Sequence, residues 1–324
     1  MGRTVTLIFL CIVSSLCSGQ AVQKPKVSTI DIDNFWQAYD STQTTQDTLR
    51  QQAFIQQLYI DRGTEGLHAF MRARDYSAPL WVRLINRYPK YWKSIRPNTL
   101  SLKSKSAEIE NSIARFKELY PSLKDAQMYF TVGGLKSGGT TDGRMVLVGS
   151  EIATGNAGTD VSEFTSNWLA EVFKEQKEDN IIPLNVHEYV HTQQKGESKN
   201  LLGQAIMEGS CDFITELVIG RLMQTTYINY GLLHEKELKE SFRKEMFSKS
   251  YNNWLYNGDH AETVADLGYF MGYQICKSYY AHSTDKKKAI KEIIELNYNN
   301  SKVVKKFLIN SGYYTGEEVS KAGE

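Results

Sequence analysis

The sequence predicts an α+β fold that is predominantly helical, with a pair of helices carrying a metal site beside a small β-sheet. Three observations lead to this prediction. Most of the chain after residue 30 places apolar side chains at three-to-four spacing, which indicates helices. Residues 125–152 change to short runs of β-forming residues separated by glycines. The string His-Glu-x-x-His occurs between His187 and His191, inside a helical pattern.

The first nineteen residues are typical of a secretory signal peptide. Arg3 precedes an apolar run over residues 5–13, which is too short to span a membrane. We therefore expect export to the periplasm or the extracellular space, with a mature chain that starts at Gln20 and contains no transmembrane span. Lipid anchoring at Cys17 is the second choice, because Leu16 stands where lipoprotein signals carry a small residue.

The composition is that of an ordinary soluble protein, with 41% hydrophobic and 23% charged residues. Without the signal peptide, 37 basic side chains balance 37 acidic ones. This balance gives no electrostatic attraction toward nucleic acid or anionic membranes, so neither is expected as a partner.

Cys211 and Cys276 remain in the mature chain. Export permits a disulfide between them, but two buried free thiols are the favoured expectation.

A polar linker over residues 20–30 leads into a helical region over residues 31–124. Phe35, Trp36 and Tyr39 mark its first helix. Further helices are expected over 49–60, 63–73, 79–88 and 106–120, with prolines after the last two. The aromatic side chains of these helices predict packing rather than ligand binding.

Residues 125–324 form the second region, expected to be one compact unit with the first. The runs 128–132 and 145–148 flank a glycine-rich stretch and predict a hairpin or a pair of strands. Helices are expected over 162–177, 181–194, 200–223, 261–280, 286–296 and 301–308.

The two histidines lie one turn apart on the predicted helix over 181–194, so His187 and His191 project from one face. Two neutral imidazoles at this spacing can hold one Zn²⁺. Glu188 lies beside them and can reach a water molecule on the same metal, which is the metalloprotease pattern with glutamate as general base.

The next predicted helix carries Glu208 and Asp212, again one turn apart. Glu208 has apolar neighbours, which favours a third zinc ligand over a solvated charge, with Glu216 as the weaker rival. Asp212 can accept a hydrogen bond from the free ring nitrogen of a zinc histidine. The predicted ligands are therefore His187, His191 and Glu208, with Asp212 behind them.

Residues 261–280 contain Tyr269 and Tyr273, four apart, with glycines at the same spacing that include Gly272. The glycines would allow close contact between helices. Either tyrosine can donate its hydroxyl to a developing oxyanion, or both can pack at a helix seam. His260 is a rival donor just before this helix.

His187-Glu188-x-x-His191 followed by Glu208-x-x-x-Asp212 resembles the gluzincin metallopeptidases, the thermolysin-like clan, although the spacing to the third ligand is shorter here. With motifs at 31–36, 88–92, 95–99 and 266–273, the mature chain also resembles a bacterial family of unknown function described as predicted Zn-dependent proteases. In gluzincins a sheet edge above the zinc helix pairs with extended substrate. The run 145–148 is the candidate for that edge.

The sequence thus predicts an exported zinc metallopeptidase that hydrolyses peptide bonds in a peptide or protein substrate. A Zn²⁺-activated water would attack the peptide, with Glu188 as general base. The alternative is a catalytically silent envelope protein that keeps the zinc and binds a peptide or partner protein. In a third possibility, the motif only stabilises the fold of a structural envelope protein.

Overall fold

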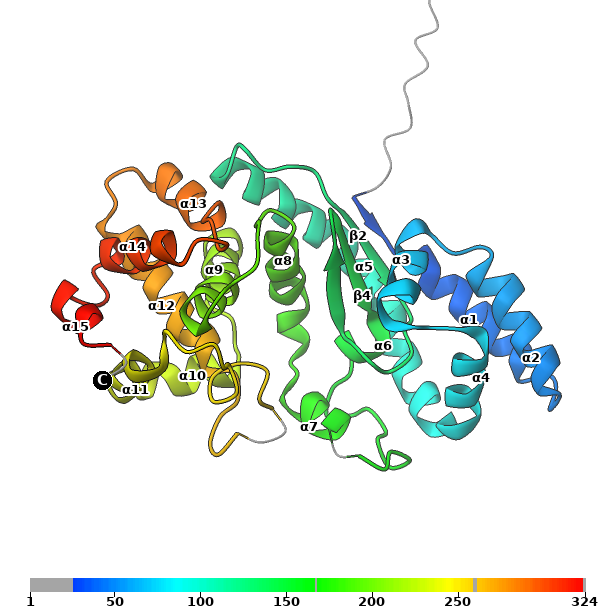
Figure 1. Ribbon diagram of the computed structural model, residues 1–324. Coiled ribbons are helices and arrows are strands. Elements are labelled where there is room, and N and C mark those ends of the chain that lie inside the picture. The colour runs from blue at the N-terminus through cyan, green and yellow to red at the C-terminus, as the bar shows by residue number, and fades with distance from the viewer. Residues whose placement is uncertain (1–25, 167, 259–260, 323–324) are drawn as a thin grey trace, which may run out of the picture.

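The computed structural model describes residues 26–166, 168–258 and 261–322, and Figure 1 shows a mostly helical fold around a small sheet. The predicted α+β class is confirmed. The signal peptide, including Cys17, most of the linker and His260 lie outside the described residues. A single cluster of buried apolar side chains extends from Val27 to Val319.

The sheet has the strand order β1-β2-β4-β3. Its strands are β1 (Val27–Ser28), β2 (Gln127–Thr131), β3 (Gly139–Asp142) and β4 (Met145–Gly149). β2 pairs in parallel with β1 and β4, whereas β3 and β4 form an antiparallel hairpin. Figure 1 shows the sheet between α8 on one side and the first four helices on the other.

The prediction that residues 145–148 form a sheet edge was wrong, because β4 pairs on both sides. The edges are β1 and β3. β1 is only two residues long, and β3 has the polar sequence Gly-Thr-Thr-Asp, so neither carries the alternating apolar pattern from which strands are predicted. β3 is the edge strand that contacts α8 (Ile181–His191), the helix that carries both histidines of the predicted site.

Four helices precede the long α5, as predicted. They are α1 (Ile30–Thr42), α2 (Thr48–Ile55) with a π-helical turn over Gln56–Ile60, α3 (Glu65–Arg74) and α4 (Ala78–Arg87). The Asp47 side chain caps α2 and that of Thr64 caps α3, each by accepting backbone N–H bonds. In the π turn, the Tyr59 hydroxyl donates to the carbonyl of Val132 and accepts from its N–H. This contact ties the helices to the end of β2.

The fifth helix is longer than predicted, because α5 runs from Pro89 to Leu119. Pro89 occupies the first turn, where the missing N–H costs nothing, so this residue starts a helix rather than ending one. Pro97 lies inside α5. Its flanking side chains Trp92 and Ile95 are fully buried, and their burial outweighs the lost backbone hydrogen bond.

Two short helices, α6 (Ser150–Ala153) and α7 (Trp168–Glu175), come after the sheet. They are followed by α8 (Ile181–His191) and α9 (Leu201–Ile219), which carry the candidate ligands. α7 is shorter than the predicted 162–177. Ser162 donates both its N–H and its hydroxyl to Asp160, which stabilises a turn in place of the first helical residues.

The C-terminal helices are α10 (Thr226–Leu233), α11 (Glu235–Glu245), α12 (Leu267–His282), α13 (Lys286–Ile294), α14 (Ser301–Ser311) and α15 (Gly316–Ser320). Of these helices, α12, α13 and α14 pack against α9, and α10 and α11 pack against α12. The close contact of α12 with α9 that was predicted for Gly268 and Gly272 is confirmed for Gly272, whereas Gly268 packs against Leu255 instead. A Cβ atom on Gly272 would lie 1.7 Å from the carbonyl oxygen of Ala205, and one on Gly209 would lie 2.0 Å from the nitrogen of Tyr273. Cys211 and Cys276 are buried free thiols, as expected.

Candidate metal centre

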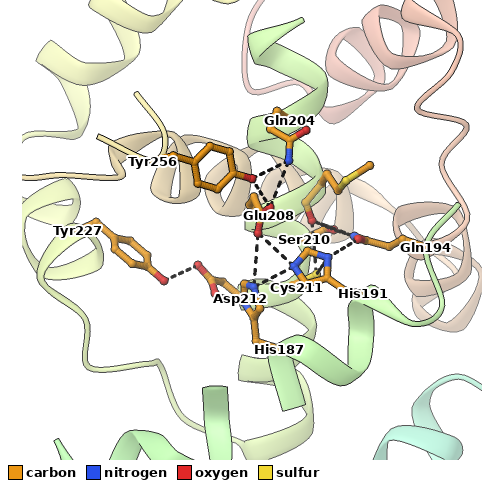
Figure 2. A network of polar contacts seen from close by, with 11 residues as sticks. His187, His191, Gln194, Gln204, Glu208, Ser210, Cys211, Asp212, Tyr227 and Tyr256 are labelled. Carbon is orange, nitrogen blue, oxygen red and sulfur yellow. Dashed lines mark hydrogen bonds and ion pairs between the residues drawn. The ribbon is translucent and has the colours of Figure 1, made fainter. Parts of the chain in front are cut away.

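α8 places two imidazoles on one face. Pro183 occupies its first turn, where proline fits a helix, and Asn185 donates its side-chain amide to the carbonyl of Ile181. His187 and His191 therefore stand one turn apart, and their Nε2 atoms are 3.1 Å from each other. Figure 2 shows both rings turned toward α9.

α9 supplies a carboxylate to the same point. The side chain of Asn200 caps this helix by accepting the N–H of Gly203. About two turns after this cap, the Oε2 atom of Glu208 lies 3.1 Å from His191 Nε2 and 3.5 Å from His187 Nε2. Ligand atoms that share a tetrahedral zinc ion at about 2.0–2.1 Å lie about 3.3 Å apart, so these three atoms fit a single Zn²⁺.

The other ring nitrogen of each histidine is also engaged. His187 Nδ1 is 2.7 Å from Asp212 Oδ1, and the hydroxyl of Tyr227 donates to Asp212 Oδ2 at 3.0 Å. His191 Nδ1 is 2.8 Å from Gln194 Oε1. These contacts fix both rings with Nε2 directed at Glu208, which is the arrangement that orients histidine ligands in metal sites.

Gln194 was not singled out from the sequence. Its amide nitrogen donates to the carbonyl of Met207 and to the hydroxyl of Ser210, both on α9. Gln194 lies just after α8, so its side chain joins the two metal-site helices and orients His191 at the same time. Its place three residues after His191 is the only local signal for this role.

The charges at the centre favour a cation. Burial lowers the pKa of His187, but the carboxylates of Asp212 and Glu208 outweigh burial and hold this pKa well above its ordinary value. Burial raises the pKa of Glu208, yet the imidazoles of His191 and His187 hold it well below its ordinary value. The same negative potential that attracts protons to the rings would attract a divalent cation.

Cys211 is a further soft ligand atom near the histidines, since ligand atoms of His187, His191 and Cys211 lie within 4.8 Å of one another. The thiol, however, is 3.4 Å from His191 Nδ1, the nitrogen that faces away from Glu208. Burial raises the pKa of Cys211 to about 12, which keeps the sulfur protonated. Glu208 is therefore the better third ligand for a cation at the Nε2 atoms.

The predicted general base, Glu188, is half-buried and lies on the sheet side of α8. Its carboxyl carbon is 3.8 Å from the position that a Cβ atom on Gly139 of β3 would occupy. Glu188 therefore lies between the metal-site helix and the edge strand.

The two tyrosines singled out from the sequence have different positions. Tyr269 stacks on His187, with 6.1 Å between the ring centroids. Tyr273 instead donates its hydroxyl to Glu216, and Lys277 also contacts that carboxylate. Glu216, the rival ligand, is therefore held on the side of α9 that faces α12, away from the histidines.

A third tyrosine, which the sequence did not single out, contacts the centre. The Tyr256 hydroxyl donates to Glu208 Oε1 at 2.7 Å and accepts from Gln204 Nε2 at 2.8 Å. Tyr256 lies on the connection between α11 and α12, and no periodic pattern there points to the centre.

The fold and the cluster together define a mostly helical α+β protein with a buried His-His-Glu centre between two adjacent helices. Residues 20–264, about three quarters of the chain, match the family described as gliding motility protein GldB, with the short name GldB_lipo. The chain therefore belongs to this family of gliding motility proteins. No curated protein and no solved structure matches it.

This family membership corrects the functional prediction. The resemblance to gluzincins and to predicted Zn-dependent proteases, and with it the assignment as a zinc metallopeptidase, was wrong, because the matched family consists of motility proteins. The physical reason is that two histidines one turn apart and a carboxylate on the next helix define a coordination geometry, which binding proteins and enzymes share. The non-catalytic envelope protein, the alternative reading, agrees better with the family.

The short name of the family denotes lipoproteins, which are associated with the cell envelope. This agrees with the expectation of export. Among the described residues, no helix is both long enough and apolar enough to cross a bilayer.

Proposed function

We propose that this protein is a non-catalytic envelope component of the gliding machinery that holds one Zn²⁺ at His187, His191 and Glu208. The bound metal would organise a surface for a partner protein. The observation that carries this proposal is the convergence of three donor atoms at mutual distances of 3.1–3.5 Å, with both Nδ1 atoms engaged behind them.

The cost of burying these charges supports a metal. Glu208 and Asp212 are 7% and 2% exposed, and they lie against two imidazoles with no Lys or Arg within ion-pair distance among the described residues. Buried carboxylates are expensive unless they are paired or coordinate a cation. Two imidazole nitrogens and one carboxylate oxygen suit zinc better than magnesium or calcium, which prefer all-oxygen sites.

The accessibility of the centre supports a role in binding. His191 and Glu188 are only half-buried, and Tyr256, which contacts Glu208, is 56% exposed. A zinc ion with three protein ligands keeps a fourth position for another donor. A group of a partner protein can approach this position from the surface, and the family membership supports a partner within the gliding machinery.

Elemental analysis of the purified mature chain tests the metal. We expect about one zinc per chain and loss of most of it in His191→Ala. His282→Ala is the matched control, because His282 is exposed and bonds only backbone carbonyls of α12 and α14. Equal zinc in both variants and in the wild type would remove His191 from the site.

Gliding of cells that carry the variants tests the function. His191→Ala should abolish gliding while the protein accumulates normally, and Glu188→Gln should keep gliding, since the proposed role needs no general base. Loss of gliding in Glu188→Gln, with zinc and stability intact, would contradict the non-catalytic role.

Fatty-acid labelling of the wild type and of Cys17→Ser would determine whether a lipid attaches the chain to the envelope.

A further inference from the structure

The two carboxylate oxygens of Glu208 have different surroundings. Oε2 faces His191 and His187, whereas Oε1 accepts hydrogen bonds from the Tyr256 hydroxyl at 2.7 Å and from the Gln204 amide at 3.2 Å. Figure 2 shows Tyr256 and Gln204 on the side of Glu208 opposite the imidazoles. One oxygen is thus directed at the metal position, and the other is occupied by protein donors.

Tyr256 reaches Glu208 from a backbone conformation that most residues avoid. Its φ is +58°, and that of Asp266 is +62°. The Tyr256 N–H donates to Asp266 Oδ1 at 2.6 Å, and the Asp266 N–H donates to Asn257 Oδ1 at 2.9 Å. A left-handed conformation is unfavourable for a non-glycine residue, because the Cβ atom approaches the following carbonyl oxygen. These contacts offset that cost and hold the hydroxyl against the carboxylate.

We propose that Tyr256, assisted by Gln204, is a positioning residue that makes Glu208 a one-oxygen metal ligand. This inference rests on the proposed metal centre. A carboxylate can bind a cation through one oxygen or both. Hydrogen bonds to Oε1 compete with the metal for its lone pairs and fix the plane of the carboxylate, so only Oε2 is offered to the cation.

The consequence concerns the partner. With Oε1 occupied, the chain supplies three donor atoms to a four-coordinate metal, and the fourth position remains for water or for a donor group of the partner. Without Tyr256, Glu208 would bind through both oxygens, so a metal that also holds water would become five-coordinate and leave less room for a donor group of the partner. Tyr256 therefore keeps the proposed centre open to a partner.

Cobalt replacement of the metal tests the inference, because four-coordinate Co²⁺ absorbs visible light more strongly than five-coordinate Co²⁺. In Tyr256→Phe we expect a weaker visible absorption per bound cobalt. We also expect a change in Co²⁺ affinity of roughly tenfold or more, the usual scale for residues that orient a ligand. Gln204→Leu removes the longer hydrogen bond and should weaken the absorption less.

Two matched variants separate this role from a general loss of structure. Tyr227→Phe removes a hydroxyl that bonds Asp212, so it should lower the affinity but keep the wild-type absorption per cobalt. Tyr279→Phe removes a tyrosine–carboxylate contact with Glu292, away from the centre, and should change neither.

Each outcome decides the question. An unchanged absorption per cobalt in both Tyr256→Phe and Gln204→Leu would overturn the role of Tyr256 while leaving the metal centre intact. If Tyr256→Phe fails to fold, Gln204→Leu decides alone. A wild-type chain that binds no cobalt would overturn the proposed metal centre and this inference with it.

Discussion

Gly272→Ala should separate α9, which carries Glu208, from α12, which packs against it. The added Cβ atom would lie 1.7 Å from the carbonyl oxygen of Ala205, whereas real Cβ atoms essentially never approach closer than 3.0 Å. α12 must therefore move away from α9 by at least about 1.3 Å, since a backbone carbonyl cannot rotate out of the way. Overpacking of this kind typically costs about 1–3 kcal/mol, and a backbone contact places the cost at the upper end.

Thermal unfolding and zinc content measure this effect. In a chain of this size, about 3 kcal/mol lowers Tm by roughly 4–5 °C. Metal sites tolerate ligand displacements of about 0.2 Å, so zinc should also bind more weakly if Glu208 moves with α9. Gly316→Ala is the control, because no atom lies within 4 Å of the added Cβ. Equal Tm values for the two variants would refute the reasoning from the close contact.

Three further perturbations test two other residues of the site and one buried carboxyl group outside it. Asp212→Ala should weaken zinc binding by roughly ten- to a hundredfold, because His187 loses its orienting partner. A zinc affinity equal to that of the wild type, measured by competition with a chelator, would contradict this. Glu188→Gln should keep the wild-type zinc content, and zinc loss would make Glu188 a ligand. Burial raises the pKa of Glu151 from 4.5 to about 7, so the folded state holds this proton more tightly than the unfolded state does. The free energy of unfolding should therefore fall as pH rises from about 4.5 to 7, by up to about 3 kcal/mol. Glu151→Gln should lack this part of the decline, and identical pH profiles of wild type and variant would count against it.

Glu151 also illustrates what sequence patterns miss. Its carboxyl oxygens accept the N–H groups of Gly133 and Leu135, so a fully buried carboxyl group fixes the loop that leads from β2 to the edge strand β3. The residue follows an apolar strand and starts a four-residue helix. No spacing in the sequence connects it with a loop more than fifteen residues earlier.

The helices were predictable wherever one apolar face decides the structure. α1, α3 and α4 follow the three-to-four spacing of their buried side chains, whereas α8 and α9 are apolar segments that are buried on nearly every side. The full length of α5 was not predictable, because Pro89 and Pro97 are local signals against a helix. The burial of Trp92 and Ile95 outweighs these signals. Strand order was also not predictable, since the polar strand β3 makes β4 an interior strand, and the two-residue strand β1, far away in sequence, does the same for β2.

The sequence by itself determined which side chains share a helix face. His187 with His191, and Glu208 with Asp212, follow from the helical repeat, because four residues always advance about one turn. Only the tertiary structure decided which atoms face each other across elements. Tyr256 meets Glu208 from 48 residues away, and one carboxylate oxygen is directed at the imidazoles while the other is occupied. Such contacts depend on the packing of the whole chain, whereas the spacing within a helix is fixed by the geometry of its backbone.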